Sequence, residues 1–79
     1  MKVRLLNDGG YRGYKGFAFT RKFPITANCM RIDGGISDGL AYISGEEMIN
    51  IGCVCDDEKV FDSPFSFYIG LECEVIHER

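Results

Sequence analysis

The residues best suited to chemistry lie in one basic and aromatic segment that runs from Tyr11 to Phe23. The segment reads YRGYKGFAFTRKF, so aromatic rings alternate with lysine and arginine along its length. Rings of this kind pack against apolar surfaces, and the neighbouring cations attract carboxylates or phosphates. The pattern predicts a binding surface for an acidic partner, formed by Tyr11, Arg12, Tyr14, Lys15, Phe17, Phe19, Arg21 and Lys22.

Two kinds of partner fit this segment. A protein partner is the first prediction, because tyrosine and arginine are enriched at the energetic centres of protein interfaces. Single-stranded nucleic acid is the alternative, since rings would stack on bases while cations follow the phosphates. A structural interpretation also stays open: Phe17 and Phe19 alternate as the core residues of a strand do, with Tyr11 and Tyr14 packing the loop.

Two resemblances bear on these alternatives. Lys15-Gly16-Phe17-Ala18-Phe19 resembles the Lys-Gly-Phe-Gly-Phe core of the cold-shock ribonucleoprotein motif, although no second motif of the Val-Phe-Val-His-Phe kind follows. Over about a third of the chain, the ranges Lys2–Tyr11 and Tyr68–Ile76 and the Phe23-Pro24 pair resemble compact accessory proteins encoded by tailed phages and prophages. The second resemblance names no family and implies a bacterial cytoplasmic setting and a protein that acts by binding.

The cysteines raise the question of a metal. Cys53 and Cys55, with Cys73 and His77, hold the donors of a structural zinc site. On a strand, Cys73 and His77 would stand about 13 Å apart at roughly 3.3 Å per residue, too far to share one ion. Free thiols packed as small apolar groups are therefore expected, with no cofactor, and a zinc-supported structural domain is the second alternative.

The sequence carries no pattern that is typical of an enzyme. Its one histidine, His77, is third from the C-terminus, and no serine stands in a Gly-X-Ser-X-Gly turn. The carboxylates of Asp56, Asp57 and Glu58 form a cluster that solvation explains. The glycines at positions 10, 13 and 16 do not match a phosphate-binding loop. We therefore expect a non-catalytic protein.

Charge is distributed unevenly along the chain. The range 1–31 holds seven cations and one carboxylate, a net charge of +6, whereas 32–79 holds two cations and eleven carboxylates, a net charge of −9. The two halves could neutralise each other in the folded domain, or the positive surface of one copy could meet the negative surface of another. Self-association as a homodimer would also help to stabilise a chain of only 79 residues.

The elements expected from the sequence are short strands separated by glycine turns. Alternation and β-branched content predict strands at Lys2–Leu6, Phe17–Thr20, Ile25–Ile32, Leu40–Ile43, Cys53–Cys55 and Phe65–Ile76. Asn7–Gly10 and Asp33–Gly35 are turns. Ser44 and Glu47 match a capping box, so one short helical turn is expected near Glu46–Asn50, ending at Gly52.

These elements predict a single small domain over residues 1–79 that is mainly β. Five or six short strands favour an SH3-like or OB-like barrel, with a mixed α+β domain as the alternative. The apolar stretches are far shorter than the roughly 20 residues that cross a bilayer. With no apolar leader after Met1, a cytoplasmic location is expected.

Overall fold

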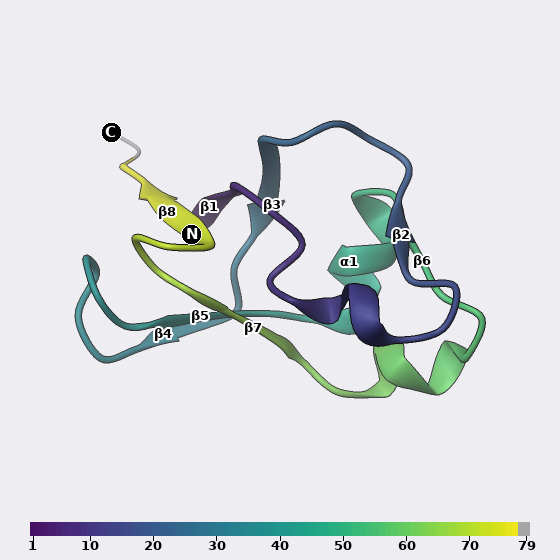
Figure 1. Cartoon of the computed structure of the whole chain (residues 1–79). Coiled ribbons are helices and arrows are strands. Elements are labelled where there is room, and N and C mark those ends of the chain that lie inside the picture. The colour runs from purple at the N-terminus through teal and green to yellow at the C-terminus, as the bar shows by residue number, and fades with distance from the viewer. Residues whose placement is uncertain (78–79) are drawn as a thin grey trace.

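The computed structural model describes residues 1–77, which fold into eight short strands, one α-helix and two 3₁₀ turns (Figure 1). The α-helix α1 spans Gly45–Asn50, and the 3₁₀ turns η1 and η2 span Tyr11–Gly13 and Glu58–Asp62. The strands are β1 (Lys2–Leu5), β2 (Ala18–Phe19), β3 (Ile25–Asn28), β4 (Arg31–Asp33), β5 (Leu40–Ile43), β6 (Cys53–Val54), β7 (Phe65–Tyr68) and β8 (Cys73–Ile76).

The strands form three antiparallel sheets, so the prediction of a mainly β fold is confirmed. Their orders are β3-β1-β8, β2-β6 and β4-β5-β7. Within residues 1–77 there are more strands than the five or six expected, and they do not close into a barrel. An SH3-like or OB-like barrel is therefore not confirmed. Among these residues, no helix is long and apolar enough to cross a membrane.

Two of the expected strands are each divided into two. Ile25–Ile32 and Phe65–Ile76 were expected to be single strands; this is wrong, because each range supplies strands to two different sheets. After β3 the chain changes its pairing partner, since the Met30 N–H donates to the Tyr42 carbonyl of β5 at 2.8 Å. Between β7 and β8 the chain turns at Gly70, whose φ of +94° is a conformation that glycine adopts without strain.

The core is built from alternate residues of the longer strands. Val3 and Leu5 of β1 are fully buried, as the alternation predicted, and Phe65 and Phe67 of β7 are almost fully buried. Three of the four cysteines also pack here as small apolar groups, and all four are free. The buried residues are Val3, Leu5, Phe17, Ile25, Ala27, Cys29, Ala41, Ile43, Met48, Ile51, Cys53, Phe65, Phe67, Ile69 and Cys73.

The helix α1 begins where the capping box predicted. The Ser44 hydroxyl accepts the Glu47 N–H at 3.0 Å, which satisfies one of the amides that the first turn leaves unpaired. The carboxylate of Glu47 accepts the N–H of Asn28 at 2.7 Å, and so links α1 to the end of β3. The side chain expected to close the capping box therefore joins two elements. Gly52 follows the helix with a φ of +98°.

Candidate functional site

The basic and aromatic segment Tyr11–Phe23, which is called the predicted segment below, lies at the end of the molecule that also carries β6, α1 and η2 (Figure 1). Its strand β2 pairs with β6, and its Lys15 carbonyl accepts the N–H of Asp56 at 3.2 Å. Gly16 has a φ of +74°, and the Asp56 side chain lies in the space that a Cβ at this position would need. The segment is therefore fixed to the chain between Cys53 and Asp56 and is not a free loop.

Of the four predicted rings, Phe17 belongs to the core and Tyr11 packs against it. Phe17 is only 8% exposed, so the expectation that it lies on the binding surface is wrong. Tyr11 is half-buried, with its ring centroid 4.8 Å from that of Phe65, and its hydroxyl accepts the Ser66 N–H at 2.9 Å. The turn at Gly9 and Gly10, both with positive φ, brings these rings back over β7. The structural interpretation of Phe17 and Tyr11 is the correct one.

The third ring, Phe19, lies at the margin of the core. It is half-buried, and it packs edge-on against Phe23 with ring centroids 4.9 Å apart. It also contacts the buried Phe17 edge-on, at 5.7 Å between centroids. Only part of its surface can therefore contact a partner.

The fourth ring and all four cations are on the surface. Tyr14 is 53% exposed and stacks on Tyr11 with a centroid separation of 6.2 Å. Within the described part of the chain, ion pairs join Arg4 to Glu74 and Arg31 to Asp33, and none involves the predicted cations Arg12, Lys15, Arg21 and Lys22. We call Arg12, Tyr14 and Lys15 the basic edge. The cations Arg21 and Lys22 are exposed further along the segment, after β2.

Tyr11→Phe is expected to lower the free energy of unfolding by about 1 kcal/mol, because the half-buried Ser66 N–H loses its hydrogen-bond acceptor. Urea unfolding followed by circular dichroism measures this loss. Tyr14→Phe is the matched control and should leave stability unchanged, since its ring is exposed and its hydroxyl makes no hydrogen bond within residues 1–77. Equal losses in the two variants would contradict the anchoring role of Tyr11.

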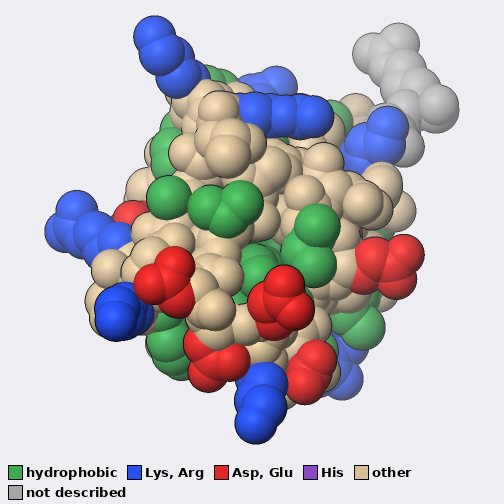
Figure 2. Space-filling view, turned by 90° about the vertical axis from the view of Figure 1, so that its right-hand side faces the viewer, with side chains coloured by type: hydrophobic (Ala, Val, Ile, Leu, Met, Phe, Trp, Pro, Cys, Tyr) green, Lys and Arg blue, Asp and Glu red, His purple; other side chains and the backbone are tan. Residues whose placement is uncertain are grey.

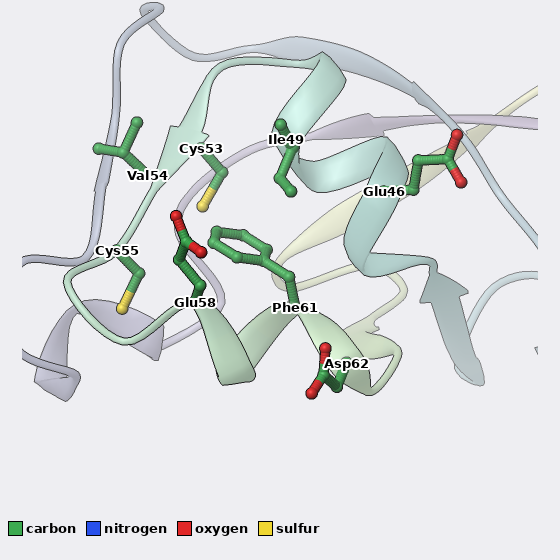
Figure 3. Close-up of a pocket in the computed structure, with 8 residues that line it drawn as sticks. All are labelled: Glu46, Ile49, Cys53, Val54, Cys55, Glu58, Phe61 and Asp62. Atoms are coloured by element: carbon green, nitrogen blue, oxygen red, sulfur yellow. The ribbon is translucent and has the colours of Figure 1, made fainter.

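A pocket of about 550 Å³ lies beside this segment, between α1, β6 and η2 (Figure 3). Its apolar wall comes from Ile49, Val54 and Phe61, and Figure 3 shows the Phe61 ring extending toward Cys53 and Ile49. The other residues that line it are Cys53, Cys55 and the three exposed carboxylates Glu46, Glu58 and Asp62. The pocket thus combines an apolar wall with an acidic rim.

The pocket was not predicted from the sequence, although the sequence held one signal for it. Met48 and Ile49 are adjacent in a helix of six residues, so they point in different directions and cannot both face the core. Met48 is fully buried, and Ile49 is 54% exposed at the pocket. Val54 is also 47% exposed, because it alternates with the buried Cys53 on β6. Large apolar side chains that stay exposed around one pocket indicate a contact surface.

The thiols of Cys53 and Cys73 are not set up for nucleophilic chemistry. Burial, and secondarily the neighbouring Cys55, raise the pKa of Cys53 to about 11. Burial, followed by Cys29, Glu72 and Glu74, raises the pKa of Cys73 to about 11. Both groups are therefore neutral thiols at pH 7, whereas the thiolate is the nucleophile and the metal ligand.

The predicted donors of a zinc site are not assembled. Cys53 lies in the β2-β6 sheet, whereas Cys73 lies in the β3-β1-β8 sheet. Among residues 1–77, no three side chains of His, Cys, Asp or Glu are close enough to hold a metal ion. The zinc-supported alternative thus has no donor set in this part of the chain.

The surface at this end of the molecule is mixed in character. Figure 2 shows hydrophobic side chains in the middle of the face, with carboxylates below and beside them and lysine and arginine around the margin. A protein surface with exposed apolar groups inside a charged rim is the usual form of an interaction site. No protein-family model, curated protein or solved structure matches this chain.

Proposed function

We propose that this protein is a small non-catalytic binding module that recognises a protein partner through the basic edge. The observation that carries the proposal is an exposed tyrosine ring flanked in the sequence by two exposed cations that have no ion pair within residues 1–77. Tyrosine and arginine are enriched among the few residues that carry most of the binding energy of protein interfaces. The cations Arg21 and Lys22 would add long-range attraction for an acidic partner.

The presence of only one exposed ring among the four predicted rings favours a protein partner over single-stranded nucleic acid. Nucleic-acid binding by stacking needs several rings that receive successive bases. Here Phe17 is buried, and Tyr11 and Phe19 are half-buried and packed on other rings, so Tyr14 alone offers an open face. The phage-like resemblance of the sequence supports a role in the bacterial cytoplasm as part of the same proposal.

The test is quantitative capture of proteins from a bacterial lysate by the tagged chain and by the double variant Arg12→Ala, Lys15→Ala. A partner that uses the basic edge should be retained about tenfold less by the variant. The control variant Arg4→Ala, Arg31→Ala removes the same charge from β1 and β4, away from η1 (Figure 1), and should retain the partner. Capture by the first variant at the wild-type level would overturn the proposal.

A fluorescent thymidine oligonucleotide provides the second arm of the test. Binding of the oligonucleotide that falls steeply between about 0.05 and 0.2 M salt would support the nucleic-acid alternative, because each phosphate contact releases counterions. We expect no such binding, since the stacking platform is missing.

A further inference from the structure

The basic edge and the acidic pocket are neighbours on the same end of the molecule. The Lys15 carbonyl accepts the Cys55 thiol at 3.4 Å and the Asp56 N–H at 3.2 Å. Cys55 is itself one of the residues that line the pocket. A single residue therefore contacts the basic edge and lines the pocket. Two surfaces of opposite charge, the basic edge and the pocket with its acidic rim, are therefore adjacent.

The two surfaces are complementary in chemistry as well as in charge. The basic edge offers one aromatic ring with a cation on each side in the sequence. The pocket offers an apolar wall of Ile49, Val54 and Phe61, and its rim holds carboxylates that have no ion pair within residues 1–77. An aromatic ring would bury the exposed apolar side chains, and the cations would meet the unpaired carboxylates.

In this fold, the Tyr14 ring does not reach the pocket of its own chain. Tyr14 stacks on Tyr11, whose hydroxyl is bonded to Ser66, and Tyr14 is not among the residues that line the pocket. Lys15 and Gly16 are fixed against Cys55 and Asp56 by the contacts described above. A second copy of the chain carries the same ring and cations, free of ion pairs.

We propose that the pocket receives the Tyr14 ring of a second copy of this chain, with the cations of that copy against Glu58 and Asp62. This inference rests on the proposed function of the basic edge and names its partner. Because the two surfaces lie side by side, a twofold axis between two copies places each ring in the other copy's pocket. In such a dimer both surfaces of each copy are occupied, so no further copies can add and no filament forms.

Charge reversal in two separate variants tests the proposal by sedimentation of the full chain over about 1–500 µM. The edge variant carries Arg12→Glu and Lys15→Glu, and the pocket variant carries Glu58→Lys and Asp62→Lys. Each variant alone sets like charges against each other, so its dimer should dissociate about tenfold more readily or not form. In an equal mixture both contacts regain opposite charges, and a dimer of wild-type strength should form between the two variants.

Three further variants test whether the Tyr14 ring is required and whether a change in total charge alone weakens the dimer. Tyr14→Ala should weaken dimerisation by about tenfold or more, whereas Tyr14→Phe should retain it, because the apolar ring is what fills the pocket. The control Arg4→Glu, Arg31→Glu has the same charge change as the edge variant, on β1 and β4, and should dimerise as the wild type does. Circular dichroism checks that every variant is folded.

The outcomes distinguish this inference from the proposed function. A wild-type chain that is monomeric throughout would overturn the dimer, and so would a dimer unaffected by both charge reversals. In either case, loss of a captured lysate protein from Arg12→Ala, Lys15→Ala would leave the proposed function standing. Failure of the mixed variants to associate, with each variant folded, would also overturn the dimer.

Discussion

Phe65→Ala is expected to remove about 3–5 kcal/mol from the free energy of unfolding. Phe65 is 1% exposed, and its ring lies 4.8 Å from that of Tyr11, 5.8 Å from that of Phe61 and 6.1 Å from that of Phe17, between centroids. The ring thus joins β7, the predicted segment and η2. At roughly 0.05–0.15 kcal/mol per residue, a domain of this size can lose most of its stability with this one ring.

Urea unfolding followed by circular dichroism measures the effect, with Tyr68→Ala as the matched control. Tyr68 lies on the same strand but is 55% exposed, so its loss should change stability by less than about 0.5 kcal/mol. Both variants remove an aromatic ring from β7, and they differ in whether the ring is buried. A loss below about 1 kcal/mol in Phe65→Ala would contradict the core described above.

Gly45→Ala is expected to destabilise the protein by about 1–3 kcal/mol or more, although alanine has the higher helix propensity. A Cβ at position 45 would overlap the backbone carbonyl of Phe61, and the Phe61 Cα would lie 2.7 Å from it. Backbone atoms cannot rotate away as a side chain does, so α1 and η2 must separate. Since these two elements form walls of the pocket, the change should also alter the surroundings of Ile49 and Phe61.

The test is whether Gly45→Ala lowers or raises the free energy of unfolding, and Gly13→Ala is the control. Nothing lies within 4 Å of a Cβ at position 13, and the φ of Gly13 is not positive. Gly13→Ala should therefore be neutral, or stabilising by about 0.4–1 kcal/mol through the unfolded chain. Thermal unfolding of both variants gives the comparison, and a more stable Gly45→Ala would show that helix propensity outweighs the contact with Phe61.

Local patterns in the sequence predicted the elements whose shape depends on nearby residues. The alternation in β1, the cap of α1 at Ser44 and the left-handed glycine at Gly52 are all observed. The divided strands could not be predicted in this way. Whether Met30 pairs with β1 or with Tyr42 depends on residues far along the chain, and no local rule specifies that choice.

The same difference between local and long-range effects applies to the candidate site. The cations of the basic edge are exposed, as their charge predicted. Phe17 is buried because it meets Phe65, which is 48 positions away in the sequence. The pocket needs α1, β6 and η2 to converge, so its acidic rim could be interpreted from the sequence only as solvated carboxylates.

The pairing of β1 also constrains how the chain can fold during synthesis. β1 is the central strand of its sheet, and Lys2 lies opposite Ile76 of β8. During synthesis β1 must therefore wait for residues 73–76 before both of its edges are hydrogen-bonded. Until then the edge of β1 that faces β8 has no hydrogen-bonding partner, and an unpaired strand edge makes a partly folded chain prone to aggregation.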